Sequence, residues 1–411
     1  MRVIVTSSVR MKTFPGPGAL EAELRAIARR QPANPIYLVG GAVRDRILGR
    51  RSSDFDFAVR EDAEQLARAL ERKGFGRAVR ISSGRSPFPV WRLARPAMTV
   101  DIARFESAAS IDGDLMRRDF TVNALALNVE SGDLCDPCGG LADLRRRRVR
   151  MVSARNLDAD PIRVLRAYRL AGELGWRIEA GTRRALAARA RTVSRQPRER
   201  VNSEIARLFR AADGARPIGW AAKDGALKAC LPLPRLQPSA VARLLAPFDG
   251  LPGDGRQRLF FRMAVLFFRA GPGPGRLPSM LAAKGFPRAE RTDAILGARF
   301  LSAALSEVAP ERMLFDFRDR WNELRPLLEI AVKSARETAR ARAVLSRARK
   351  CNFHRPPVDG RDIAAWLSLP PGKMLGRALD HARYLYFSGA ARTRSQIERK
   401  LRSIDALPTV G

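Results

Sequence analysis

The chain has 411 residues, enough for several hydrophobic cores, and usual domain sizes suggest about two to four units. No apolar run reaches the roughly 20 residues that cross a bilayer, and four cysteines are too few for a disulfide scaffold. These features exclude a membrane partner and favour a cytoplasmic protein, whereas the formal net charge of +34 indicates a nucleic acid or another polyphosphate as partner.

Hydrophobic periodicity changes near residue 158. Short strands and helices are mixed between residues 36 and 151, whereas the later segments have the pattern of amphipathic helices separated by Pro/Gly breaks. The sequence therefore predicts an α+β protein, in which a small mixed-sheet domain is followed by three helical units.

The first expected strand, residues 36–39, ends at the glycine pair Gly40-Gly41 and is followed by a helix over 42–48. Residues 54–59 alternate strictly between polar and apolar positions. Because side chains on a strand alternate between its faces, Asp54 and Asp56 are expected to share a face that opens on a cleft, with the aromatic residues on the core side.

A helix is expected over residues 61–73, and two strands follow at 90–93 and 98–103. On the second of these strands Asp101 shares a face with its polar neighbours, and this face is expected to meet that of the first aspartate pair. Asp101 is then a candidate third acidic group near a metal, although a polar position at a sheet edge explains it equally well.

Two carboxylates on one strand face have the geometry for Mg²⁺, which prefers a few carboxylates together with phosphate oxygens. Metal held in this way activates an attacking hydroxyl and stabilises a pyrophosphate leaving group. A bare pair of aspartates on an exposed strand also serves solubility alone. The preceding glycines favour the metal site, because a backbone without Cβ atoms can approach a triphosphate closely.

Three ordered motifs resemble the class II tRNA nucleotidyltransferases (CCA-adding enzymes) and their relatives, the bacterial poly(A) polymerases. The motifs are LVGGAVRD at 38–45, DFD at 54–56 and RRDFTVNAL at 117–125. DPCGGL at 136–141 and DPIRVLRAYR at 160–169 extend the resemblance over roughly residues 35–210, and VDGRDI and PPGK near the C-terminus add a shorter match.

The resemblance implies a nucleotidyltransferase head followed by all-α neck, body and tail regions. The expected boundaries are 1–34 for an N-terminal leader and helix, 35–152 for the head, 153–215 for the neck, 216–345 for the body and 346–411 for an RNA-binding tail.

The resemblance also implies roles for individual residues. Asp54 and Asp56 would be the metal ligands and catalytic residues, together with Asp101 if it joins them. The nucleotide's phosphates or sugar would be held by Gly40, Gly41, Arg44 and Arg118, and Asp119 is expected to orient Arg118.

Nucleotide choice is expected to depend on the segment that begins at Asp160. Asp160 and Arg163 are spaced as helix neighbours, so a carboxylate acceptor and guanidinium donors can face the edge of one base. CTP and ATP present an amino donor beside a ring-nitrogen acceptor on that edge, and UTP and GTP reverse this pattern. Arg166 and Arg169 are expected to meet phosphate or RNA. The alternatives are an ordinary helix start at Asp160 and a solvated basic face.

Two departures from the family pattern affect specificity. Ala159 stands where the family commonly has Glu, so a group that braces the base-reading pair is missing. The segment between Phe105 and Arg117 is also shorter than the flexible loop that is implicated in switching from CTP to ATP. Partial activity, either CC or A addition, is therefore expected beside full CCA addition.

The sequence thus predicts a Mg²⁺-dependent enzyme that adds C or A, from CTP or ATP, to an RNA 3′ end, most naturally that of tRNA. A bacterial poly(A) polymerase and a non-catalytic RNA-binding protein are the alternatives. With His354 and His381 as the only histidines, a His-rich phosphohydrolase site is excluded. At the pair Cys135 and Cys138, the residues Asp136, Pro137 and Gly139 are expected to form an ordinary turn, and the oligomeric state is not determined.

Overall fold

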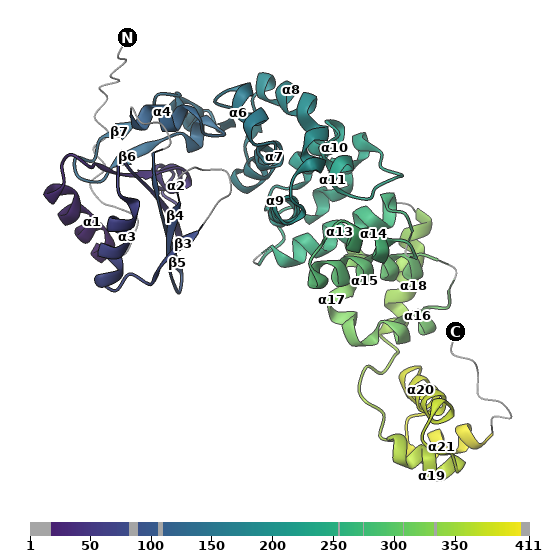
Figure 1. The fold of residues 1–411 in the computed structure, drawn as a ribbon. Coiled ribbons are helices and arrows are strands. Elements are labelled where there is room, and N and C mark those ends of the chain that lie inside the picture. The colour runs from purple at the N-terminus through teal and green to yellow at the C-terminus, as the bar shows by residue number, and fades with distance from the viewer. Residues whose placement is uncertain are drawn as a thin grey trace. The chain divides into compact units, whose positions relative to one another are not determined.

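The computed structural model describes residues 18–81, 89–105, 110–253, 255–273, 275–306, 308–332 and 335–403 (Figure 1). The chain forms two compact units that divide between Cys230 and Leu231. The finer boundaries of head, neck, body and tail remain predictions, and residues 1–17 of the expected leader lie outside the described part.

The first unit contains a seven-stranded mixed sheet with the strand order β3-β4-β5-β2-β1-β6-β7. Its strands are β1 (Ile36–Val39), β2 (Asp54–Val59), β3 (Ala78–Ile81), β4 (Val90–Arg95), β5 (Met98–Arg104), β6 (Ala126–Asn128) and β7 (Leu134–Cys135). The neighbours β2 and β5 are parallel, and the other pairs in this sheet are antiparallel. The predicted mixed-sheet head is confirmed.

Strand β2 has the two-sided character that its alternation predicts. Phe55, Phe57 and Val59 are at most 2% exposed and contribute to the core, whereas Asp54 and Asp56 are exposed. Helix α3 (Ala63–Arg72) packs against the sheet through β4 and β5, and α1 (Gly18–Arg30) lies beside α3 (Figure 1). The helices therefore cover one face of the sheet. Asp54 and Asp56 project from β2 on the opposite side from its buried aromatic residues.

The rest of the first unit is mainly helical. Its helices are α2 (Gly41–Ile47), α4 (Ile111–Met116), α5 (Gly140–Arg145), α6 (Ala154–Ala159), α7 (Ile162–Leu174), α8 (Ala180–Arg189), α9 (Arg198–Arg210), α10 (Ala215–Lys223) and α11 (Ala226–Cys230). The two-residue strands β8 (Arg148–Val149) and β9 (Arg177–Ile178) pair in parallel. The pattern of amphipathic helices did not reveal β9, because a two-residue strand is too short to show a period.

The second unit is helical throughout its described part. Its longer helices are α13 (Arg256–Ala270), α15 (Arg288–Ala304), α17 (Trp321–Ala331), α18 (Ala335–Ala348) and α20 (Lys373–Phe387), and the shorter ones are α12 (Val241–Leu245), α14 (Leu277–Ala283), α16 (Pro310–Asp316), α19 (Gly360–Leu367) and α21 (Arg394–Arg402). Helix α13 is buried over most of its length and packs against α15, whereas α19, α20 and α21 enclose a small core of their own. None of the described helices is long and apolar enough to cross a membrane.

A buried carboxylate fastens the segment after the sheet. The side chain of Asp143, on α5, is completely buried, and it accepts hydrogen bonds from the Thr121 hydroxyl at 2.7 Å, from Arg148 and from Arg150 at 2.7 Å. Burial by itself would raise the pKa of Asp143, but these donors outweigh it and hold the pKa below its ordinary value.

We expect Asp143→Asn to lower the free energy of unfolding of the first unit by about 1–3 kcal/mol at pH 7, because the buried Thr121 hydroxyl and the two arginines lose their charged acceptor. A depressed pKa in the folded state means that this stabilisation is present above the unfolded pKa near 4 and is lost as the pH falls through the folded value. Urea unfolding should therefore show a large deficit at pH 7 and a small one near pH 3.

Asp158→Asn is the matched control, because the Asp158–Arg189 ion pair lies on the surface with the aspartate side chain 59% exposed. We expect it to cost less than about 1 kcal/mol. Equal costs for the two variants, or a cost of Asp143→Asn that does not depend on pH, would contradict this account of the buried carboxylate.

Candidate active site

The carboxylates of β2 and β5 lie on one face of the sheet. In the parallel pairing Asp56 stands beside Asp101, and Asp54 stands beside Thr99. The expectation that the two polar faces meet is therefore confirmed. Asp101 is also bound by Arg92, its partner position on β4, through two hydrogen bonds of 2.7 Å. This guanidinium, which the motif analysis did not include, balances one of the clustered negative charges.

Asp56 is electrostatically distinct within this group. Surrounding protein raises the pKa of its carboxyl group, Arg118 opposes the shift, and the nearby charges of Asp101 and Asp54 add to it. The carboxylate nevertheless remains open to solvent. A group of clustered carboxylates that faces solvent is suited to receive a cation, because a bound cation relieves the repulsion between them.

The bend at Gly40 brings Arg118 close to this face. Gly40 follows β1, where Val39 pairs with Asp56, and it has φ 77° and ψ −138°, which side-chain-bearing residues rarely adopt. A Cβ atom there would lie 2.9 Å from Nη1 of Arg118 and 3.6 Å from Oδ2 of Asp56. A Cβ atom at Gly41 would meet Arg44 at 3.4 Å. The glycine pair, both predicted arginines and Asp56 thus gather at one place.

Acidic side chains hold both of these arginines, and Arg44 also has an amide partner. Arg44 donates to the Asp45 carboxylate at 2.8 and 2.9 Å and to the Asn123 side-chain oxygen at 2.6 Å. Arg118 pairs with Asp114, one turn earlier along the chain, at 3.3 Å. The Arg118 side chain is 25% exposed, so its guanidinium remains partly accessible near the carboxylate face.

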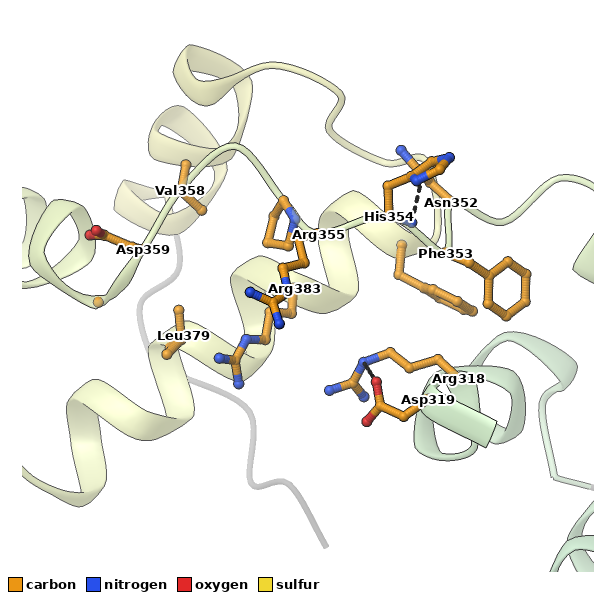
Figure 2. Close-up of a pocket in the computed structure, with 13 residues that line it drawn as sticks. Arg318, Asp319, Asn352, Phe353, His354, Arg355, Val358, Asp359, Leu379 and Arg383 are labelled. Carbon is orange, nitrogen blue, oxygen red and sulfur yellow. Dashed lines mark hydrogen bonds and ion pairs between the residues drawn. The ribbon is translucent and has the colours of Figure 1, made fainter. Parts of the chain in front are cut away.

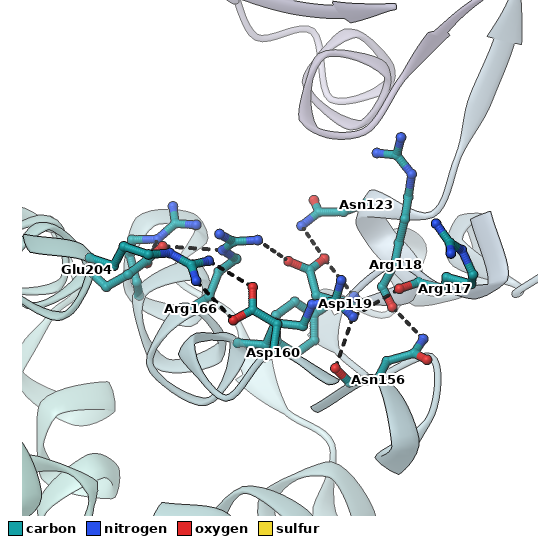
Figure 3. A network of polar contacts seen from close by, with 12 residues as sticks. Arg117, Arg118, Asp119, Asn123, Asn156, Asp160, Arg166 and Glu204 are labelled. Atoms are coloured by element: carbon teal, nitrogen blue, oxygen red, sulfur yellow. Dashed lines mark hydrogen bonds and ion pairs between the residues drawn. The ribbon is translucent and has the colours of Figure 1, made fainter. Parts of the chain in front are cut away.

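The prediction that Asp119 orients Arg118 is wrong. Asp119 is buried, and its carboxylate accepts hydrogen bonds from Arg166 at 3.0 Å, from the Asn123 amide at 3.2 Å and from the Phe120 backbone at 2.8 Å (Figure 3). Burial raises the pKa of Asp119, but the charge of Arg166 outweighs it and lowers the pKa overall. The next helix supplies the partner because α7 packs over this turn.

Two side chains from α6 and α7 fasten the backbone on either side of Arg118. Asn156 donates to the carbonyl oxygens of Met116 and Arg118 at 2.8 and 2.7 Å, and Arg163 donates to those of Arg117 and Asn156 at 2.9 and 3.0 Å (Figure 3). The segment that carries Arg118 is therefore attached directly to the helices that were expected to read the base.

Asp160 and Arg163 have separate partners in this structure. Asp160 lies at the C-terminal end of α6 and accepts hydrogen bonds from Nη1 and Nη2 of Arg200 at 3.3 and 2.8 Å. Its backbone is extended, Pro161 is helical, and the Asp160 carbonyl oxygen accepts a hydrogen bond from the Arg163 amide at 3.0 Å, as at an ordinary helix start. The predicted base-reading role stays a prediction.

The other two neck arginines contact α9. Arg166 donates to Glu204 at 3.3 Å as well as to Asp119, and Arg169, only 7% exposed, lies between Glu204 at 2.6 Å and Glu173 at 2.5 Å. A buried guanidinium with two carboxylate partners holds α7 against α9. Binding of phosphate or RNA by Arg166 and Arg169 remains a prediction.

Several polar residues at this site were not predicted from the motifs. They are Arg92, Asp114, Asn123, Asn156, Arg200 and Glu204. Arg92 could have been found from the expected antiparallel pairing of its strand with β5. Arg200 and Glu204 carry no such local signal, because their partners lie 40 and 38 residues away in the sequence.

Cys135 ends β7, and the residues from Asp136 to Gly139 form a turn, as predicted. Asp136 accepts hydrogen bonds from the backbone amides of Gly140 and Leu141 at 2.6 and 2.9 Å. Cys135 and Cys138 are free thiols, and burial raises the pKa of each to about 11. A thiol that stays protonated at neutral pH is a poor metal ligand and a poor nucleophile.

The second unit contains a pocket of about 650 Å³ (Figure 2). It is lined by Arg318, Asp319, Asn352, Phe353, His354, Arg355, Pro356, Val358, Asp359, Gly360, Leu379, Arg383 and Phe387. Phe353 is 39% exposed and stacks on Trp321 with the ring centroids 6.0 Å apart. An accessible ring among three arginines is an unusual surface, because large aromatic residues are more often buried.

Comparison with known proteins places the chain in a family. Residues 36–150 match the family described as "Poly A polymerase head domain". The chain is 41% identical over 195 residues to a CC-adding tRNA nucleotidyltransferase of Synechocystis sp., covering 46% of this chain and 45% of the relative. It is 40% identical over 214 residues to an A-adding tRNA nucleotidyltransferase of Deinococcus radiodurans, covering 50% and 48%. These two matches span about half of each relative.

A third match is longer and less identical. A CC-adding tRNA nucleotidyltransferase of Geobacter sulfurreducens is 29% identical over 399 residues, covering 89% of this chain and 91% of the relative. Among solved structures, the Bacillus stearothermophilus CCA-adding enzyme in complex with CTP has the same fold, with a TM-score of 0.70, 24% identity and coverage of 94% and 97%. The head match and these relatives together show that residues 36–150 belong to the poly(A) polymerase head-domain family and that the chain is similar to tRNA nucleotidyltransferases over most of its length.

Proposed function

We propose that the protein is an RNA 3′-terminal nucleotidyltransferase that adds C or A residues to tRNA and releases pyrophosphate. The observation that carries the proposal is the arrangement of Asp54, Asp56, Gly40 and Arg118 on one face of the head. In that arrangement the tRNA 3′-hydroxyl attacks the α-phosphate of CTP or ATP. Both reactants, the tRNA and the nucleoside triphosphate, are negatively charged, which fits the large positive charge of the protein.

The donor set fits magnesium. Asp54 and Asp56 are oxygen ligands on adjacent same-face positions, and both are accessible. Within the described ranges, no three Asp, Glu, His or Cys side chains converge as a metal-binding group. Magnesium at this face would thus take two carboxylates and complete its shell with phosphate oxygens and water, as Mg²⁺ commonly does. When bound, it would activate the hydroxyl and neutralise charge on the phosphates.

The surrounding residues position the nucleotide. The bare backbone at Gly40 and Gly41 admits the triphosphate, and Arg118 and Arg44 supply positive charge to it. Asp101 contributes to the negative face, and its charge is shared with Arg92. On the neck side, Asp160 accepts from the amino group of cytosine or adenine, Arg163 donates to the ring nitrogen, and Arg166 and Arg169 complete the basic wall.

We further propose that the enzyme makes partial additions, CC or A, instead of a complete CCA end. Two of the relatives reported above are CC-adding and one is A-adding. The segment between Phe105 and Arg117 is short; residues 106–109 lie outside the described part, and α4 occupies 111–116. A short loop favours an enzyme that uses only CTP or only ATP over one that switches from CTP to ATP. CC addition is the first choice, because the relative that matches over 399 residues is a CC-adding enzyme.

The test is nucleotide incorporation by the full chain with Mg²⁺ on three tRNA transcripts, which end before the first C, before the second C and before the terminal A. CC addition predicts extension of the first two with CTP and no extension of the third. Extension of the third alone with ATP would indicate A addition, and a long tail on unstructured RNA would indicate a poly(A) polymerase. Salt-sensitive RNA binding without any incorporation would overturn the enzyme assignment.

The pocket in the second unit supports the predicted RNA-binding role of the C-terminal region. Phe353 offers a ring face for an unpaired base, and Arg318, Arg355 and Arg383 offer charge for phosphates. We expect Phe353→Ala to raise the KM for tRNA about fivefold to 150-fold with kcat unchanged, because base stacking contributes about 1–3 kcal/mol. Steady-state kinetics with varied tRNA measures this effect.

Met374→Ala is the control for this variant, since Met374 is another exposed apolar side chain of the same unit, 47% exposed, and it does not line the pocket. It should leave the KM for tRNA unchanged. An unchanged KM in Phe353→Ala, or a fall in kcat that equals the fall in kcat/KM, would show that the pocket does not bind RNA.

A further inference from the structure

Helix α9 carries two opposite charges on the face that contacts Asp160 and α7. Arg200 and Glu204 are separated by one helical turn. Arg200 binds the carboxylate of Asp160, whereas Glu204 binds Arg166 and Arg169. Since α7 and α9 pack closely together, α9 contacts the base-reading segment and the arginines behind it at the same time.

Asp160 lies at the junction between α6 and α7. It follows the last residue of α6 with extended backbone, φ −141° and ψ 91°, and Pro161 comes next. The preceding side chain is the exposed methyl group of Ala159, which offers no hydrogen bond. Arg200 reaches the carboxylate from α9 with two nitrogens, and the Asp160 side chain is only 15% exposed. A partner distant in sequence thus fixes both oxygens.

This contact leaves the carboxylate able to bind a base. Each carboxylate oxygen accepts about two hydrogen bonds, and Arg200 uses one position on each. The remaining positions suit an exocyclic amino donor. Uracil or guanine would present a carbonyl oxygen there instead, and two acceptors that face each other repel and make no hydrogen bond. The discrimination depends on the carboxylate keeping one orientation.

We propose that Arg200 is a positioning residue that determines base selectivity by holding Asp160 in its base-reading orientation, in the place of the bracing Glu that Ala159 lacks. The inference rests on the proposed function. On this inference, the choice between nucleotides depends partly on α9, through the contact of Arg200 with Asp160.

The experiment compares wild type, Arg200→Met and Arg200→Lys in the full chain. For each, kcat/KM is measured separately for CTP, ATP, UTP and GTP on the tRNA that the wild type extends. We expect Arg200→Met to reduce the preference for the correct nucleotide over UTP and GTP by about tenfold or more, because two charge-assisted hydrogen bonds orient the carboxylate. Arg200→Lys keeps the charge without the bidentate geometry and should recover part of the preference.

Arg207→Met is the matched control. Arg207 also joins α9 to α7, by an ion pair with Glu173 at 3.0 Å, and its side chain is 51% exposed. Loss of this pair should leave the nucleotide preference unchanged. A double variant supplies a second readout: in an Asp160→Asn background, Arg200→Met should reduce the preference no further, because the group that it positions is already altered.

The outcomes separate this inference from the proposed function. A wild-type chain that incorporates no nucleotide overturns the proposed function, and the inference with it. An active wild type and an Arg200→Met variant with undiminished preference overturns the inference alone. An equal loss of kcat/KM for all four nucleotides would also overturn it, since that result indicates only a structural role for Arg200.

Discussion

Asp56→Asn is expected to reduce kcat for nucleotide addition by about 1,000-fold or more while the chain stays folded. The substitution keeps the size of the side chain and removes its charge, so a cation at this face would be left to Asp54. Stability should move in the opposite direction to activity. A raised pKa in the folded state means that ionised Asp56 destabilises the fold at neutral pH, so the neutral amide should leave the midpoint of thermal unfolding equal or higher.

Single-turnover incorporation with saturating tRNA measures the first effect, and thermal unfolding without nucleotide measures the second. Asp133→Asn serves as the control, because Asp133 lies in the turn between β6 and β7, where it accepts a hydrogen bond from Ser131. It should retain normal turnover. Full activity in Asp56→Asn, or inactivity that comes with unfolding, would contradict the role proposed for this carboxylate.

Gly40→Ala should lower kcat/KM about 100-fold through crowding at the phosphate site. The new methyl group would lie 2.9 Å from Nη1 of Arg118, so the guanidinium must shift from its position. The positive φ of 77° adds backbone strain, which costs about 1–3 kcal/mol of the free energy of unfolding. Steady-state kinetics and urea unfolding measure the two effects.

Gly49→Ala separates these contributions. Gly49 has a similar φ of 67°, and a Cβ atom there would meet no atom within 4 Å. This variant should lose some stability through its positive φ and keep its activity. If both variants lose activity equally, backbone strain explains the result and the contact between Gly40 and Arg118 has no role in binding.

The elements that carry the candidate site were predictable because their signals are local. The alternation in residues 54–59 determined which face of β2 carries the aspartates, and the glycine pair marked the end of β1. The pairing of Asp56 with Asp101 followed from two polar strand faces that had to avoid the same core. Such patterns are properties of a few consecutive residues.

The partners of the charged side chains were not predictable in the same way. Asp119 was assigned to its neighbour Arg118, yet it pairs with Arg166, 47 residues away. Asp160 was placed with Arg163 and is held by Arg200, 40 residues away. These choices depend on how α7 and α9 pack against the head. A carboxylate with several arginines nearby selects among them by burial and geometry, which the order of residues does not specify.

The most direct test of the whole account is a crystal structure of the full chain with a non-hydrolysable CTP analogue and Mn²⁺, whose anomalous signal marks the metal. The account predicts manganese on the carboxylates of Asp54 and Asp56, with the triphosphate passing Gly40 toward Arg118 and the cytosine amino group facing Asp160. A triphosphate bound elsewhere in the chain, with no metal on this pair of aspartates, would contradict it.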